Sequence, residues 1–215
     1  MKKVILFCCS AALLMTACNS SGSDEKPNGD SGTKTEVKSD APAAAPLDSA
    51  TKAKNWQMYM TPGDVHKMMA SWDGTWDGEV TMWMPGTPEM KSKSTAVNKM
   101  AMGGRYQVSN HHGDVMGMPF EGMSTLAYDN AKKTFTSTWI DNMGTGMMVM
   151  EGPWDAATKS ATLSGKGVDP ETYQEKSFRE TFSVIDDNTQ LMAMYGPGPD
   201  GKEVKMMEIK YTRKK

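Results

Sequence analysis

The sequence GTWDGEVTMWM at residues 74–84 decides the fold, because apolar and polar side chains alternate along it. One face carries Trp76, Gly78, Val80, Met82 and Met84, and the other carries Thr75, Asp77, Glu79 and Thr81. A period of two residues is that of a β-strand with one buried face. We therefore predict a strand over residues 75–84 whose apolar face points into the interior of the fold.

Turn-forming residues then recur at short intervals to the end of the chain, for example at residues 85–86, 103–104, 129–130 and 199–201. Between the turns we predict about ten strands, at residues 75–84, 92–102, 105–112, 119–128, 132–141, 146–154, 158–165, 176–185, 189–195 and 203–213. Evenly spaced short strands are typical of sandwiches and barrels. Because the connections are mostly of hairpin length, we expect consecutive strands to pair antiparallel. The sequence thus predicts an all-β fold, an up-and-down barrel.

A short helix is predicted immediately before the first strand. Thr61, Pro62 and Asp64 provide a capping residue, a first-turn proline and a first-turn acid. Spacings of three and four residues then place one apolar face on this helix, made of Val65, Met68, Met69 and Trp72. We expect the helix, from Pro62 to Ser71, to cap one end of the barrel with Met68, Met69 and Trp72.

The N-terminus has the pattern of a signal peptide over residues 1–17, with Lys2 and Lys3 followed by an apolar run. This run is shorter than the about 20 residues that a transmembrane helix needs. Residues 15–18, Met-Thr-Ala-Cys, resemble the lipobox of bacterial lipoproteins, in which the cysteine is acylated. We therefore expect a lipid anchor at Cys18 and a location in the bacterial cell envelope, at the outer membrane or the cell surface. The alternative is an ordinary secreted protein.

The remaining chain divides into two parts. Residues 18–54 are rich in Ser, Gly, Asp, Lys, Pro and Ala and show no apolar periodicity, which predicts a disordered tether. Residues 55–215 are long enough to form one domain with its own core, and we assign the barrel to them. The oligomeric state is left open by the sequence.

Composition excludes several kinds of chemistry. The three cysteines all lie within residues 8–18, so the barrel has no disulfide, no thiolate metal site and no cysteine nucleophile. The formal net charge is −2 and the chain has no Lys/Arg-rich run, so we expect no nucleic-acid partner. Nucleotide-binding, hydrolase and metalloprotease motifs are missing from the sequence. We therefore expect neither an enzyme nor a cofactor.

The opening of the first strand, Gly-Thr-Trp-Asp-Gly at residues 74–78, resembles the Gly-x-Trp signature of the calycin, or lipocalin-like, barrels. Further segments, at residues 103–106, 120–122, 127–129, 139–142 and 208–213, resemble the bacterial family catalogued as domain of unknown function 1579. The resemblance spans nearly the whole domain and implies a calycin-type barrel in secreted or lipoprotein form. It implies no activity.

The lipocalin resemblance also implies a structural contact between Trp76 on the first strand and Arg213 on the last, as a cation–π pair that closes one end of the barrel. Nitrobindin-like barrels share the same opening and bind haem through a histidine late in the chain. No histidine follows His112, which disfavours haem here.

Two polar features of the strands were considered as sites. His111 and His112 are adjacent in a strand, so their side chains point to opposite faces and do not suit one metal ion. A solvated strand end is the favoured interpretation, and we predict no metal site. Glu180 alternates with Phe178 and Phe182, so its carboxyl group is placed on the inner face, where it needs a partner from a basic side chain or a ligand.

The chain contains 22 methionines, many of them two residues apart within predicted strands. Methionine is flexible and suits an interior that accepts apolar guests. We therefore predict a barrel that binds a small apolar or amphipathic ligand, lined by Trp76, Met82, Met84, Met148, Met150, Phe178 and Phe182. Three alternatives stay open: an interaction or structural lipoprotein with a filled barrel, a Cu(I)-binding protein using thioether ligands, and an oxidant scavenger.

Overall fold

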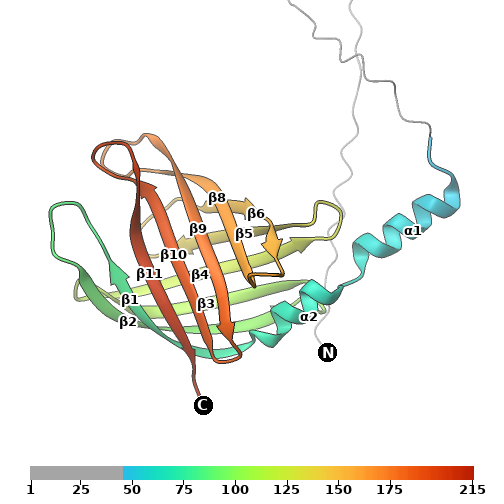
Figure 1. Ribbon diagram of the computed structural model, residues 1–215, viewed down its shortest axis with the longest axis horizontal. Helices are drawn as coiled ribbons and strands as arrows, with labels where there is room; N and C mark the ends of the chain where they lie inside the picture. The colour runs from blue at the N-terminus through green and yellow to red at the C-terminus, as the bar shows by residue number, and fades with distance from the viewer. Residues whose placement is uncertain (1–45) are drawn as a thin grey trace, which may run out of the picture. The chain divides into compact units, whose positions relative to one another are not determined.

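The chain forms the predicted strands with shifts of a few residues at their ends. A computed structural model describes residues 46–215. Two helices, α1 (Ser49–Met60) and α2 (Asp64–Ser71), precede the strands. The strands are β1 (Gly74–Met82), β2 (Met90–Ala101), β3 (Tyr106–Val115), β4 (Met118–Asp129), β5 (Thr134–Asp141), β6 (Met148–Gly152), β7 (Trp154–Asp155), β8 (Ser160–Val168), β9 (Glu175–Asp186), β10 (Thr189–Pro197) and β11 (Glu203–Arg213). Figure 1 shows the strands as a strongly curved sheet, with β1 beside β11.

The sheet closes on itself. Its strand order is β6-β5-β4-β3-β2-β1-β11-β10-β9-β8-β7, and β6 also pairs with β8. The first and last strands pair antiparallel, with Trp76 opposite Arg213 and Met82 opposite Met207. This closure confirms the predicted all-β, up-and-down barrel.

Strands β6 and β7 occupy one position in the ring, because both pair with β8. They are separated by Pro153, which has no N–H group to donate to the ladder. The predicted strand at residues 146–154 is therefore present but interrupted. Counted by position, the ring has the ten strands that the sequence predicts.

Helix α2 caps one end of the barrel, as predicted. Met69 is fully buried and Trp72, which ends the helix, is 4% exposed. Both belong to the larger core cluster, together with Phe135 and Leu163, and Met68 packs against that cluster. The apolar face of the helix is thus the lid over one end of the lumen.

Barrel side chains bind the carbonyl groups at the end of α2. Gln107 donates to the carbonyl oxygen of Met69 at 2.7 Å. The indole N–H of Trp76 donates to the carbonyl oxygen of Trp72 at 2.9 Å. The last carbonyl groups of a helix have no partners within the helix itself, so these bonds fix the lid to the wall.

Helix α1 is a correction to the predicted tether, which extended to residue 54. Asp48 caps this helix by accepting a hydrogen bond from the Thr51 amide at 2.8 Å. No residue of α1 is buried, so the helix has no apolar stripe that a search for periodicity could detect. Asn130 donates to the Met58 carbonyl at 3.0 Å, which joins the end of α1 to the barrel.

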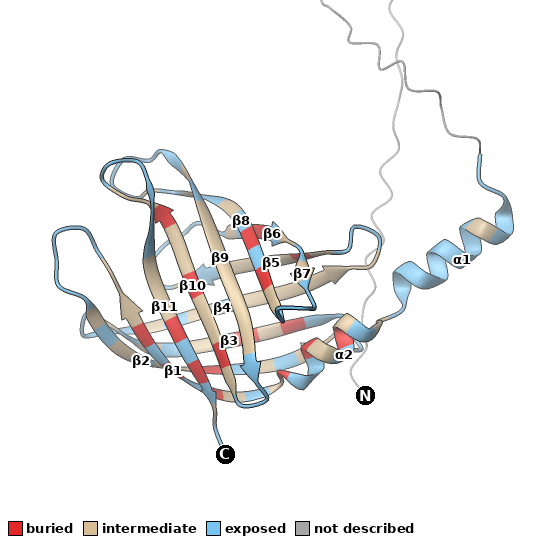
Figure 2. Ribbon diagram, viewed as in Figure 1, coloured by how far each residue is buried: buried red, intermediate tan, exposed pale blue. Residues whose placement is uncertain are grey.

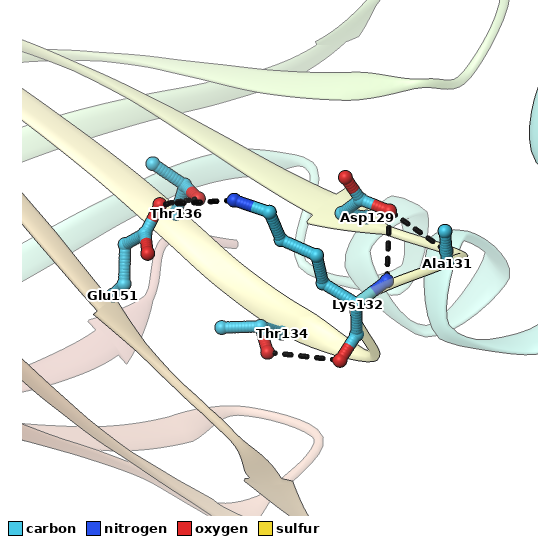
Figure 3. Close-up of polar contacts among 6 residues, drawn as sticks. All are labelled: Asp129, Ala131, Lys132, Thr134, Thr136 and Glu151. Carbon is cyan, nitrogen blue, oxygen red and sulfur yellow. Dashed lines mark hydrogen bonds and ion pairs between the residues drawn. The ribbon is translucent and has the colours of Figure 1, made fainter. Parts of the chain in front are cut away.

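Aspartates shape many of the turns. In the β4–β5 turn, Asp129 Oδ1 accepts hydrogen bonds from the amides of Ala131 at 2.7 Å and Lys132 at 3.0 Å, as Figure 3 shows. The Lys132 ammonium also lies 3.9 Å from the Glu151 carboxylate of β6. The same pattern of an aspartate accepting from an amide two residues on recurs at Asp141, Asp155, Asp169, Asp186 and Asp200. These side chains stabilise the hairpins by mimicking a backbone turn.

Burial alternates along β1 as predicted. Trp76, Gly78 and Val80 are buried, while Asp77 and Glu79 are exposed. On most other strands the inner positions are only half-buried, and Figure 2 shows few fully buried residues along them. The barrel is therefore packed near the lid and hollow elsewhere.

The predicted signal peptide over residues 1–17, the acylation of Cys18 and most of the tether lie outside the described residues. Among residues 46–215, none of the helices has the length and apolar character needed to cross a membrane.

Candidate functional site

The barrel encloses a cavity of about 760 Å³. Trp72 and Trp76 line it at the end covered by α2, and Met84, Asp114 and Met143 line it at the opposite end of the strands. A volume of this size is typical of sites for small organic ligands. The walls of the cavity differ in chemistry from one side of the barrel to the other.

One side of the cavity is rich in methionine. Eight methionines line it: Met82, Met84, Met143, Met148, Met150, Met192, Met194 and Met207. Val80, Leu163, Phe182 and Ile209 also belong to the lining. This wall is apolar and can adapt its shape, because unbranched thioether side chains change rotamer easily.

Strands β2 to β5 supply a hydroxyl-rich wall. Its serines are Ser92, Ser94, Ser109, Ser124 and Ser137. Serine at these inner positions leaves space in the lumen that larger side chains would occupy. It also offers hydroxyl groups to a polar ligand atom.

His111 lies in this wall and takes part in a chain of hydrogen bonds. Its Nε2 lies 2.9 Å from the Ser109 hydroxyl oxygen. That hydroxyl donates to Asn98 Oδ1, and Asn98 Nδ2 donates to the Trp72 carbonyl at 3.3 Å. Because the Ser109 proton is used, the histidine Nε2–H is the donor to Ser109.

The other ring nitrogen of His111 is free for a ligand. Within residues 46–215, Nδ1 has no hydrogen-bond partner. Burial and, to a lesser extent, the neighbouring His112 lower the pKa of His111 to about 4, so the imidazole is neutral at physiological pH. The edge of its ring meets Trp139, with ring centres 5.0 Å apart. Nδ1 is therefore a fixed hydrogen-bond acceptor.

Glu180 on β9 lines the cavity, as its alternation with Phe178 and Phe182 indicated. Its carboxyl group makes no hydrogen bond or ion pair with the residues that the structure describes. Burial raises the pKa of Glu180 to about 7. Burial also raises the pKa of Tyr211 on the neighbouring part of the wall, and the charge of Glu180 adds to this rise.

Two polar atoms on the wall are fully buried without a partner, the Ser94 hydroxyl and the Gln190 amide nitrogen. Both residues line the cavity. Ser94 and Tyr211 face each other across Gly78, their partner in the two ladders of β1. A Cβ atom at Gly78 would collide with the Ser94 hydroxyl, so glycine at this position keeps room for both side chains.

The predicted ligand-binding residues are placed as follows. Trp76, Met82, Met84, Met148, Met150 and Phe182 all line the cavity. Phe178 does not belong to the lining. Its ring lies over Gly167 and Gly196, where a Cβ atom would approach it to 3.1 and 2.9 Å. The ring fills the space that these two glycines leave, and packs against the larger core cluster.

The predicted contact between Trp76 and Arg213 is a stacked pair. The guanidinium carbon lies 4.2 Å from the centre of the indole ring. Arg213 also donates to the carbonyl oxygens of Ser71 at 2.8 Å and Asp73 at 2.7 Å. The pair therefore joins the first strand, the last strand and the end of the α2 lid.

The structure also bears on metal binding. His111 lines the cavity and His112 is exposed, which agrees with the expectation that they face opposite sides. The favoured interpretation of a solvated strand end is therefore wrong for His111, whose side chain belongs to the inner wall. No group of three or more His, Cys, Asp or Glu residues within residues 46–215 is arranged to hold a metal ion. That finding does not concern thioether ligands, which are considered below.

Sequence reasoning missed the hydroxyl-rich wall, Gln190 and Tyr211. The signal was present as inner strand positions that carry small polar residues. Such positions read as solvent-facing when apolar side chains alone are used to find the inner face.

Two solved structures are similar to this chain. The crystal structure of Rv2717c from M. tuberculosis matches with a TM-score of 0.57 and 11% identity, over 72% of this chain and 100% of that one. The structure of S-type phycobiliprotein lyase CPES from Guillardia theta matches with a TM-score of 0.47 and 9% identity, over 70% of this chain and 93% of that one. At such identities a match concerns the fold alone.

No curated protein matches this sequence. The sequence profile of the family described as "Protein of unknown function (DUF1579)" matches residues 61–213, which include helix α2 and every strand of the barrel. The chain belongs to this family.

Proposed function

We propose that this protein binds a small amphipathic molecule inside its barrel. The observation that carries the proposal is the cavity of about 760 Å³, which combines a methionine-rich wall with two buried polar atoms that have no partner, the Ser94 hydroxyl and the Gln190 amide nitrogen. An apolar cavity with a few convergent polar groups is the usual form of a small-ligand site. We further propose that acylated Cys18 holds this barrel at the bacterial envelope.

The apolar part of the ligand would lie against the methionines, and its polar part would meet His111, Gln190 and Ser94. Each unpartnered buried group costs about 1 to 3 kcal/mol unless a ligand or water satisfies it. A ligand with a polar end therefore gains specificity as well as affinity. A barrel filled by its own side chains, the first alternative, does not agree with a cavity of this volume.

The proposal is tested by blocking the cavity. The full chain is titrated with an uncharged fluorescent analogue of a long-chain alcohol, and saturable binding is expected. Ser124→Phe places a ring into the lumen from the hydroxyl-rich wall and should abolish uptake. Val97→Phe, at an exposed position of β2, is the matched control and should bind as the wild type does. Equal uptake by both folded variants would show that the analogue binds outside the barrel.

A second candidate function, Cu(I) binding, is favoured by one row of methionines. Met82 lies opposite Met207, and Met207 lies opposite Met194, so three thioethers line the cavity side by side on adjacent strands. Opposite residues in a sheet have Cβ atoms about 5 Å apart, and soft sulfur ligands select Cu(I). Retention of Cu(I) against a chelator, lost in Met82→Leu with Met207→Leu, would establish this function.

A further inference from the structure

The charges on the cavity wall are unbalanced. Its titratable residues come from five strands: Lys93 on β2, His111 and Asp114 on β3, Asp141 on β5, Glu180 on β9 and Tyr211 on β11. Lys93 is exposed and alternates with Ser92 and Ser94. His111 is neutral, as described above. Asp114 is exposed as well, so the less exposed part of the wall holds two carboxyl groups, Asp141 and Glu180, and no cation.

Glu180 is the carboxyl group of the cavity that has no partner from the protein. Its neighbours in the ladders are Leu163 on β8 and Met194 on β10, neither of which can donate a hydrogen bond to it. The adjacent Arg179 cannot help, because its guanidinium binds the Glu203 carboxylate at 2.6 and 2.9 Å and stacks on Tyr195. A buried carboxylate without a counter-charge is costly. The protein itself does not supply that counter-charge.

Two carboxylates lie at the end of the cavity opposite α2, where the exposed Lys93 also belongs to the lining. Asp141 lies at the open end, where its carboxylate accepts hydrogen bonds from the Trp139 indole at 2.7 Å and the Met143 amide at 2.9 Å. Asp114 accepts from the Gly117 amide at 2.7 Å. Two carboxylates and one ammonium group give this opening a net negative charge, which attracts cations and repels anions.

We propose that the cavity selects cationic amphiphiles, and that the ammonium group of the ligand pairs with the carboxylate of Glu180. This inference rests on the proposed function of the cavity. An anionic amphiphile would have to place its charge beside Glu180 with no base to neutralise either group. A neutral amphiphile would leave the carboxylate unpaired. An ammonium group can pair with Glu180, and its long alkyl chain can pack against the apolar side chains of the cavity.

Binding is coupled to the release of a proton. In the empty barrel near neutral pH, part of the population holds Glu180 as the neutral acid, since its pKa is raised to about 7. When the ammonium group enters, the O–H bond of Glu180 breaks, its proton passes to the buffer and the carboxylate pairs with the cation. No other bond is formed or broken.

The test uses the full chain and three probes with the same alkyl chain, namely dodecylamine, dodecanol and dodecanoate. Trp72, Trp76, Trp139 and Trp154 line the cavity, so intrinsic tryptophan fluorescence reports occupancy without a label. We expect dodecylamine to bind at least about tenfold more tightly than either other probe, a difference that one buried ion pair can supply.

Two variants on the same strand separate the roles of charge and fold. Glu180→Gln keeps the size of the side chain and should remove the preference for dodecylamine, while the affinity for dodecanol stays within about twofold. Glu175→Gln is the control, because Glu175 is exposed and pairs with Lys166 on the outer surface. It should keep the wild-type order of affinities.

Calorimetry of the wild type in two buffers of different ionisation enthalpy provides a readout that needs no variant. Proton release should appear with dodecylamine and not with dodecanol. Equal or tighter binding of dodecanol or dodecanoate would overturn the inference but leave the ligand-binding function standing. Failure of all three probes to bind would contradict both. An unchanged preference for dodecylamine in Glu180→Gln would show that the cation lies elsewhere.

Discussion

The guanidinium of Arg213 stacks on the indole of Trp76, with 4.2 Å between the guanidinium carbon and the ring centre. The two residues are also opposite each other in the ladder between β1 and β11. The same guanidinium binds two carbonyl groups at the end of α2. One side chain therefore fastens the seam of the barrel and its lid together.

Replacing Arg213 should weaken the fold measurably. We expect Arg213→Ala to lower the free energy of unfolding by about 2 kcal/mol, from loss of the cation–π contact and of charge-assisted hydrogen bonds. Urea denaturation measures the effect. Lys210→Ala, at an exposed position of the same strand, should change it by less than about 0.5 kcal/mol. Equal effects of the two changes would remove Arg213 from the seam.

Glu180 should make the protein less stable as the pH rises. Its pKa is about 7 in the folded chain against an ordinary value of 4.5, so the folded state holds this proton more tightly than the unfolded state does. The contribution of Glu180 to the free energy of unfolding is greatest below about pH 4.5. It falls as the pH rises to about 7, by on the order of 3 kcal/mol. The free energy of unfolding is measured by urea denaturation across this range for the wild type and for Glu180→Gln. The difference between the two proteins should show that fall. A flat difference would contradict it.

His111 should have the opposite dependence on pH. Its pKa is lowered from 6.5 to about 4, so the unfolded state takes up a proton first as the pH falls. Stability from the neutral imidazole is present above about pH 6.5 and is lost towards pH 4. Between about pH 4.5 and 6.5 the two residues offset each other in the wild type. His111→Gln should therefore expose the slope of Glu180, and a variant whose profile matches the wild type would count against this assignment.

The lipid anchor is tested by Cys18→Ser. We expect the wild type, expressed in a bacterium that acylates lipoproteins, to partition into the detergent phase, because several acyl chains give a strong preference for apolar surroundings. The variant should stay in the aqueous phase. Mass spectrometry of the N-terminal peptide provides the control for acylation. Equal partitioning of the two proteins would exclude Cys18 as the anchor.

The barrel could be predicted from sequence because its strands carry two independent signals. Alternation along residues 74–84 fixes the inner face of the first strand, and the aspartate-rich turns mark where each hairpin reverses. Helix α1 could not be predicted in this way. It buries no residue, so its apolar side chains obey no period.

The site was predictable only in part. Methionines and Phe182 at inner positions predict an apolar wall. The alternation of side chains along β9 predicts that Glu180 points inward. The space around Phe178 depends on Gly167 and Gly196, which belong to β8 and β10 and become its neighbours only when the barrel closes. Glu180 likewise lacks a partner because of the residues that lie beside it on the neighbouring strands. The register between those strands cannot be derived from a single sequence.

Closure of the ring affects how readily the protein can aggregate. Because β6 and β7 together pair with β8, the described part of the chain has no long open strand edge; only β7, two residues long, pairs on one side alone. An open edge is a template on which a second molecule can add its own strand, which is how many β proteins aggregate. If the proposed lipid anchor concentrates the barrel at a membrane, the closed ring protects it from polymerising through its backbone.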